Sequence, residues 1–180
     1  IMSFTVISCF TEDFSPFADQ LKSDCERLGY AHHIEQINSG FDDLISIFDF
    51  KVKWIRECVE KLGRVLWLDV ECRLIRPVPQ DWVFPFVSCY GADRVARYPS
   101  SGVLGVGRES LDLLTKWEEL SRRFSCPDDF VLEALMIQKK GCLQRIPIEF
   151  TSRKIPRAIV RGQWDNRATV IQHPTTNRWI

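Results

Sequence analysis

Two carboxylates stand one residue apart in this sequence, directly after a run of apolar residues. The run is Val65 to Leu68, and the acids are Asp69 and Glu71. Because side chains alternate along an extended chain, both carboxylates should point to the same side. Paired carboxylates repel unless a cation lies between them, and Mg²⁺ or Mn²⁺ prefers oxygen ligands and shares substrate phosphates. The pair predicts a divalent metal site; the alternative is a turn cap at Asp69 and a surface ion pair at Glu71.

The elements around the acids alternate between strands and helices. Strands are predicted over residues 4–10 and 30–37, and helices over 15–28 and 49–62. Residues 64–68 show no polar alternation, which is typical of a strand buried on both faces of a parallel sheet. This β-α-β-α-β order predicts an α/β protein built as a three-layer α/β/α sandwich with a mostly parallel central sheet.

The second half of the chain is less regular. Strands are predicted near residues 84–90, 103–106 and 168–171, and amphipathic helices over 109–124 and 127–140. The sequence has no internal repeat, low-complexity segment or linker. We therefore expect residues 1–180 to form one domain, which is an ordinary size for a single core.

Composition argues against several classes of protein. Lysine plus arginine and aspartate plus glutamate number 24 each, so no overall charge attracts nucleic acid or anionic membranes. The apolar runs are too short to span a bilayer, and no basic segment typical of a signal peptide precedes the first strand. Seven scattered cysteines without a CxxC pair indicate reduced thiols. We expect a cytoplasmic protein without a membrane span.

Further polar residues follow the other predicted strands and helices. In an open parallel sheet, ligands bind outside the carboxyl ends of the strands. Thr11 and Asp13 follow the first strand, where they would contact a bound ligand or form a polar turn. Lys51 opens the helix predicted over 49–62, where a cation gains nothing from the helix dipole. A contact between Lys51 and a diphosphate would explain a lysine at this position. Arg178 would close over the same phosphates, unless the C-terminus is frayed.

The sequence around the acids resembles a known family. RVLWLDVECRLIRPVP resembles the DxD segment of GT-A-fold glycosyltransferases, in which an apolar strand ends in acids that hold a metal against a nucleotide-sugar diphosphate. VISCFTED resembles the first strand and nucleotide-contacting loop, and FKVKWIRECVEKLG the helix before the motif. SSGVLGVGRESLDLLTKWEEL is similar to the N-S-G-V segment after it, and VIQHP to a late histidine of the metal shell. The resemblance is strongest to nucleotide-diphospho-sugar transferases related to the glycogenin-like group.

The resemblance implies a GT-A-like fold and a role for each matching residue. The second acid is a glutamate instead of the commoner aspartate, and it keeps the oxygen ligands that such a metal needs. An acid near the start of the helix over 127–140 would orient or deprotonate the acceptor hydroxyl, although a helix cap explains acids there equally well. The implied residues are Asp69, Glu71 and His173 for the metal, Ser101 and Gly102 for the donor, and Asp128 or Asp129 for the acceptor. An ordinary surface role is the alternative for His173.

The function expected from these features is metal-dependent sugar transfer from a UDP-hexose to a hydroxyl acceptor. The acceptor could be a glycan, a protein, a small metabolite or, because arginines cluster near the C-terminus, DNA. A nucleotidyltransferase is one alternative, but the loop TEDFSP after the first strand lacks the glycines that such enzymes use there. A non-catalytic nucleotide-sugar-binding domain is the other.

Overall fold

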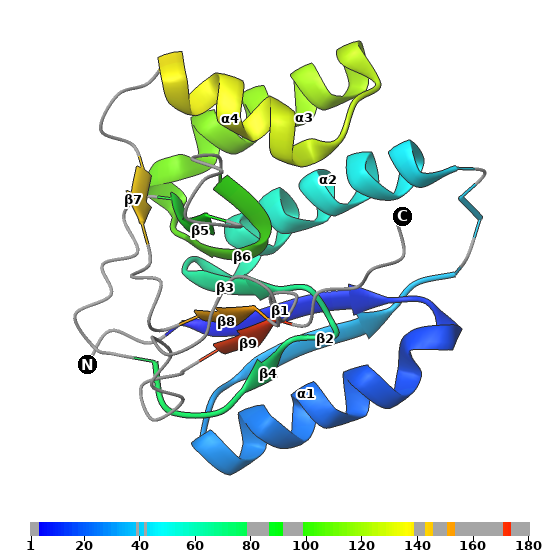
Figure 1. The fold of residues 1–180 in the computed structure, drawn as a ribbon, viewed down its shortest axis with the longest axis vertical. Coiled ribbons are helices and arrows are strands. Elements are labelled where there is room, and N and C mark those ends of the chain that lie inside the picture. Colours follow the sequence, from blue (N-terminus) through cyan, green and yellow to red (C-terminus); the bar gives the residue numbers. More distant parts are fainter. Residues whose placement is uncertain are drawn as a thin grey trace, which may run out of the picture.

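A mixed β-sheet with helices on both faces forms the core of the fold (Figure 1). The computed structural model describes residues 4–38, 40–41, 43–78, 87–91, 99–138, 143–145, 151–153 and 171–173. The first half contains β1 (Thr5–Phe10), α1 (Ser15–Leu28), β2 (His32–Gln36), α2 (Leu44–Leu62) and β3 (Val65–Leu68). The predicted β-α-β-α-β order is therefore confirmed.

The second half adds short strands and two helices. They are β4 (Arg73–Leu74), β5 (Val87–Gly91), β6 (Pro99–Val106), α3 (Leu111–Phe124), α4 (Asp128–Gln138), β7 (Leu143–Arg145), β8 (Thr151–Arg153) and β9 (Ile171–His173). Short 3-10 helices at Glu12–Phe14 and Arg108–Ser110 precede α1 and α3. The predicted strand start at residues 84–86 and the predicted strand residues 168–170 lie outside the described part of the chain.

The main sheet is mostly parallel, as predicted. Its strand order is β2-β1-β3-β6-β5-β7. β1 pairs in parallel with β2 and with β3, and β5 pairs in parallel with β7, while β6 runs antiparallel to both of its neighbours. A smaller sheet of β4, β9 and β8 accompanies it. The parallel pairing of β1 and β3 brings the carboxyl ends of both strands to one edge of the sheet.

Helices cover the two faces of the main sheet, with α1 on one face and α2, α3 and α4 on the other (Figure 1). α1 buries Ala18 and Leu21 in one apolar core, which also contains Leu74 of β4. The other core contains Ile55 of α2 and Trp117 of α3. β3 lies between the two cores, and all four of its residues are buried. The α/β/α sandwich is thus confirmed.

Helix α2 begins five residues earlier than the sequence predicted. Its N-cap is Asp43, whose Oδ1 accepts hydrogen bonds from the backbone N–H and the hydroxyl of Ser46. Such a cap satisfies an N–H group that has no partner within the helix. Lys51 consequently lies in the third turn of α2, and its predicted place at the helix N-terminus was wrong. Among the described residues, no helix is both long enough and apolar enough to cross a membrane.

Candidate functional site

The side chains of β3 alternate between the two faces of the sheet, and this places Asp69 on the face that α2 covers. Val65 and Trp67 pack in the core beneath α2, whereas Leu66 and Leu68 pack against the α1 side. Asp69 comes next on the α2 side, and Val70 returns to the α1 core, as the sequence predicted. The strand therefore aims this carboxylate toward α2 at the carboxyl edge of the sheet.

Lys51 meets Asp69 at that edge. The lysine is only 8% exposed, and its Nζ lies 3.3 Å from Asp69 Oδ1 and 3.1 Å from Asp128 Oδ2. The same Nζ donates a hydrogen bond of 2.8 Å to the hydroxyl of Ser101. We call Lys51, Asp69, Ser101, Asp128 and Asp129 the Lys51 cluster. It joins α2, the end of β3, β6 and the start of α4.

The acids of the cluster keep Lys51 charged. Burial alone would lower the pKa of a lysine, because an ammonium loses its hydration inside a protein. Here the negative charges of Asp128, Asp69 and Asp129 outweigh burial and raise the pKa of Lys51 above its ordinary value. The cluster therefore has a fixed, protonated cation at its centre at physiological pH.

Two backbone contacts hold the acids of α4 in the cluster. Trp117 of α3 is fully buried, and its Nε1 donates a 3.1 Å hydrogen bond to the carbonyl oxygen of Asp128. The backbone N–H of Ser101 donates to Asp129 Oδ1 at 2.5 Å. Burial, followed by the charge of Asp128, raises the pKa of Asp129, although Lys51 lowers it. A carboxyl group with a raised pKa is suited to accept a proton near neutral pH.

Trp67 is a member of the site that the sequence analysis missed. Its Nε1 donates to Asp69 Oδ1 at 3.2 Å, and Lys51 Nζ lies 5.5 Å from the centre of one of its rings. The signal was present in the sequence, because residues two apart on a strand project to the same side. A tryptophan two positions before an acid can donate to it.

A tight turn carries the second acid, Glu71, so the prediction of an extended chain through both acids was wrong. The N–H of Asp69 donates to the carbonyl of Gly102 at 2.8 Å, and the N–H of Cys72 donates to the carbonyl of Asp69 at 2.8 Å. We call residues 69–72 the acidic turn. The strand β4 begins directly after it and pairs antiparallel with β9, with Arg73 opposite Gln172. The backbone of His173 therefore lies one position further, at the level of Cys72.

Of the three predicted metal ligands, Asp69 and Glu71 have described side chains. The side chain of His173 and the whole of Arg178 lie outside the described part of the chain. Among the described side chains, no three His, Cys, Asp or Glu residues form a group that could hold a metal ion. The metal set proposed from the sequence stays a prediction.

Thr11 and Asp13 lie at the same edge of the sheet, outside the Lys51 cluster. β1 and β3 are in register with Ile7 opposite Trp67, so residues beyond Phe10 continue past the level of Asp69. The carbonyl of Thr11 accepts a 2.9 Å hydrogen bond from the N–H of Phe14, which closes the 3-10 turn that contains exposed Asp13. Their contact with a nucleotide remains a prediction.

A cysteine also lies beside the cluster, at the end of β1. Burial raises the pKa of the Cys9 thiol to about 12, even though the nearby charge of Lys51 lowers it. A thiol with this pKa is protonated at neutral pH, whereas the thiolate is the reactive form. Burial therefore favours the unreactive, protonated form of Cys9.

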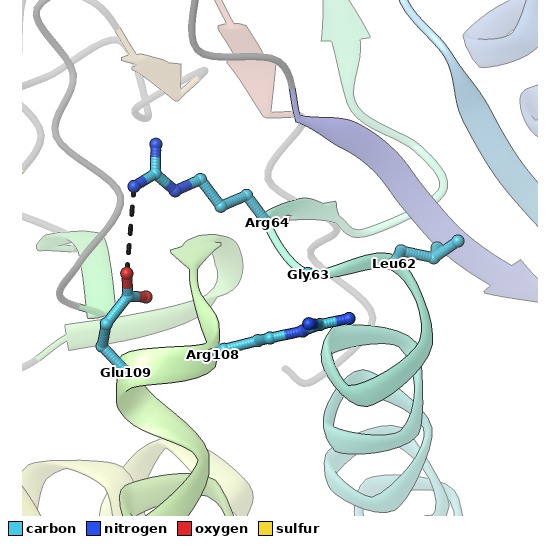
Figure 2. A pocket seen from close by; sticks show the side chains of 5 residues that line it. All are labelled: Leu62, Gly63, Arg64, Arg108 and Glu109. Atoms are coloured by element: carbon cyan, nitrogen blue, oxygen red, sulfur yellow. Dashed lines mark ion pairs between the residues drawn. The ribbon is translucent and has the colours of Figure 1, made fainter.

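A surface pocket of about 300 Å³ lies at the opposite end of β3. Figure 2 shows its lining by Leu62, Gly63, Arg64, Arg108 and Glu109, with Arg64 turned toward Glu109. Arg108 donates a 3.3 Å hydrogen bond to the carbonyl of Glu60, so it completes the end of α2. The pocket lies at the start of β3 and the acids lie after its end. About 16 Å of extended chain therefore separates the pocket from the acids. The pocket is no part of the Lys51 cluster.

Comparisons with known proteins show the fold. No protein-family model and no curated protein matches the sequence. The structure is similar to a glycosyltransferase involved in the glycosylation of the major capsid of PBCV-1, with a TM-score of 0.72 and 14% identity over 98% of this chain and 96% of that one.

It is also similar to the glycosyltransferase GlyE of Streptococcus pneumoniae TIGR4. The apo-form of GlyE gives a TM-score of 0.64 and 11% identity over 96% of this chain and 54% of that one. A second GlyE structure gives a TM-score of 0.57 and 12% identity over 83% of this chain and 46% of that one. The chain thus spans about half the length of GlyE. At these identities the similarity establishes a GT-A-like glycosyltransferase fold, as the sequence predicted.

Proposed function

We propose that this chain is a metal-dependent glycosyltransferase that transfers a sugar from a UDP-hexose to a hydroxyl acceptor. The observation that carries the proposal is the Lys51 cluster, in which three carboxylates gather around one buried ammonium at the carboxyl end of β3. Ligands of open α/β sheets bind at this edge. The glycosyltransferase fold supports the choice of reaction.

Asp69 and Glu71 are the residues proposed to hold the divalent cation, with His173 as the third ligand. Carboxylate oxygens suit Mg²⁺ or Mn²⁺, and two protein carboxylates suffice for a cation that substrate phosphates also bind. The Asp69 side chain is 30% exposed, so solvent reaches it. One ammonium also faces three carboxylates, which favours a further cation. When bound, such a cation would counter the charge that develops on the diphosphate as the glycosidic bond breaks.

The residues of the Lys51 cluster then divide into two roles. Lys51 fixes Asp69 and Asp128 relative to each other, since its Nζ contacts both. Asp129 is the proposed catalytic base, because its pKa is raised and the Ser101 N–H donates a 2.5 Å hydrogen bond to its Oδ1, which orients the carboxylate. It would orient the acceptor hydroxyl and take its proton. Asp128, only 3% exposed, is better suited to hold Lys51 than to meet an acceptor.

The remaining residues are proposed to contact the donor. Thr11 and Asp13 would meet the nucleoside, Arg178 the diphosphate and Gly102 the sugar. Ser101 is 3% exposed, and both its hydroxyl and its N–H bind members of the Lys51 cluster. We therefore propose that Ser101 acts through Lys51 and Asp129 instead of touching the sugar.

The acceptor is proposed only as a class. The PBCV-1 protein is involved in the glycosylation of a major capsid, which makes glycosylated protein the first acceptor to test. Free glycans, small metabolites and DNA, which the sequence also allowed, are the other acceptors in such a screen.

Donor hydrolysis and transfer test the proposed function. The protein is incubated with UDP-glucose, UDP-galactose or UDP-GlcNAc and Mn²⁺, and mass spectrometry follows UDP and the sugar product. We expect turnover of one donor that requires the metal and is lost in Asp69→Asn. Glu109→Gln, an exposed acid at the opposite end of β3, is the matched control and should keep full activity. Undiminished turnover in Asp69→Asn would refute the proposal, and donor binding without turnover would indicate a binding domain.

A further inference from the structure

A buried aspartate of α1 contacts the strand that follows the acidic turn. Asp24 is only 2% exposed, although it lies in the middle of a helix that faces an apolar core. Its carboxylate accepts hydrogen bonds from Arg73 Nε at 2.6 Å and Arg73 Nη2 at 3.1 Å, and Arg27 Nη2 lies 3.3 Å away. A buried carboxylate needs such partners, because its desolvation is costly. Asp24 is therefore built into the fold.

Asp24 also binds the backbone of β4. Asp24 Oδ2 accepts a 3.1 Å hydrogen bond from the N–H of Leu74, and Arg27 Nη2 donates to the carbonyl of the same residue at 2.5 Å. β4 is an edge strand of the small sheet, with β9 on its other side. Asp24 and Arg27, one helical turn apart, thus supply the acceptor and donor that a neighbouring strand would supply. They take the place of a strand at this edge.

The acidic turn is held from both ends as a result. At its start, the N–H of Asp69 donates to the carbonyl of Gly102 in the main sheet. At its end, Asp24 fixes β4 against α1, and the hydroxyl of Tyr30 accepts a 2.7 Å hydrogen bond from the N–H of Val78 further on. Glu71 lies between these two anchors. Its position relative to Asp69 depends on both of them.

We propose that Asp24 is a positioning residue that fixes the acidic turn, and with it Glu71, for binding of a divalent cation and nucleoside diphosphate. The proposal rests on the proposed function of the same site. Residues that orient metal ligands without touching the metal change metal affinity by about 10–100-fold when they are replaced. Asp24 acts through the backbone of β4, so we expect an effect near the lower end of that range.

The test compares Asp24→Asn with two other variants of α1. Asp19→Asn is the matched control, because Asp19 is 78% exposed and has only a 3.9 Å ion pair with Lys22. Arg27→Met removes the donor to Leu74 at a half-exposed residue, so it should fold even if Asp24→Asn does not. Circular dichroism establishes a temperature at which each variant tested is folded.

The first readout is calorimetric binding of UDP at a series of Mn²⁺ concentrations. We expect the Mn²⁺ concentration for half-maximal UDP binding to rise about tenfold in Asp24→Asn and less in Arg27→Met, and to stay unchanged in Asp19→Asn. A residue that only stabilised the fold would lower the unfolding temperature without moving this concentration. Equal Mn²⁺ dependence in folded wild type, Asp24→Asn and Arg27→Met would overturn the proposal.

The second readout does not depend on any ligand. Hydrogen exchange measured by mass spectrometry should become faster in the peptide covering residues 69–74 of Asp24→Asn, while peptides of β1 keep their protection. Unchanged exchange over 69–74 would overturn the proposal. If wild type itself binds no UDP with Mn²⁺, the proposed function is refuted and the role of Asp24 falls with it. If wild type binds and the variants bind equally well, the role of Asp24 alone is refuted.

Discussion

Replacing Lys51 by methionine is expected to destabilise the protein strongly. Methionine matches the length of the lysine stem but removes the ammonium that lies 3.3 Å from Asp69 Oδ1 and 3.1 Å from Asp128 Oδ2. Ser101 also loses the donor to its hydroxyl. The carboxylates of the Lys51 cluster would then face one another without a counter-ion, in a place where water cannot solvate all of them.

The magnitude follows from the burial of the partners. Removing one member of a buried ion pair costs about 3–5 kcal/mol, because the other charge remains buried and unpaired. The side chain of Asp128 is 4% exposed and feels this cost fully, whereas Asp69, at 30%, can turn toward solvent. We therefore expect a loss of about 3–4 kcal/mol. For a chain of this size that lowers the unfolding temperature by roughly 6–16 °C.

Thermal unfolding at pH 7, followed by circular dichroism, measures this loss. Lys53→Met is the matched control, because Lys53 lies on the same helix, is 47% exposed and pairs with Glu57 only at 3.8 Å. Exposed pairs contribute about 0–1 kcal/mol, so the control should unfold close to wild type. Adding Asp128→Asn to Lys51→Met should recover part of the loss, since it removes one unpaired charge. The reasoning is refuted if Lys51→Met and Lys53→Met unfold at the same temperature.

Three further predictions concern stability. Trp117→Phe loses the donor to the carbonyl of Asp128 and should cost about 0.5–1.5 kcal/mol in urea unfolding; wild-type stability would contradict this. The pKa of Asp129 is raised, so its charged form is disfavoured in the fold, and stability falls as pH rises through that pKa. Asp129→Asn should remove this fall, which begins above the ordinary aspartate pKa of about 4. The pKa of Asp24 is lowered because Arg73 and Arg27 outweigh burial, so its contribution is lost as pH falls below about 4, and Asp24→Asn should flatten that acid branch.

Much of the fold was predictable from local patterns. Residues 65–68 carry only apolar side chains, and the structure buries all four between two layers of helices. The glycines that end α1 and α2 were visible as terminators, and both have positive φ, at 74° for Gly29 and 88° for Gly63. Patterns of this kind act within a few residues, so the sequence reveals them directly.

The start of α2 was missed for an identifiable reason. The apolar stripe of the helix is clear from Val52 onward. The earlier turns, residues 44–50, are apolar at nearly every position, with polar residues only at Ser46 and Asp49, so their sequence does not mark where the helix begins. The cap at Asp43 was the available signal, because an aspartate three residues before a serine can accept its N–H. Placing Lys51 at the N-terminus suggested a phosphate contact, whereas the third turn of α2 brings it to Asp69 instead.

The candidate site depended on contacts that no local pattern contains. Asp69, Ser101 and Asp128 come from three separate elements. The antiparallel pairing of β6 with β3 places Ser101 near Asp69, and the contacts of α4 with α3 and β6 add Asp128. The resemblance to GT-A enzymes pointed to these residues. It did not predict that the side chain of Lys51 contacts all three of them. The role of Asp24 could not be predicted either, because its partners Arg73 and Leu74 lie about 50 positions away in the sequence.

Calorimetric titration of UDP into the wild-type protein, with Mn²⁺ and with the metal chelated, tests the central claim most directly. The account predicts binding that requires Mn²⁺ and disappears in Asp69→Asn, because the acids at the end of β3 would hold the cation that the diphosphate shares. Absence of binding in both conditions, or equal binding with and without the metal, would contradict it.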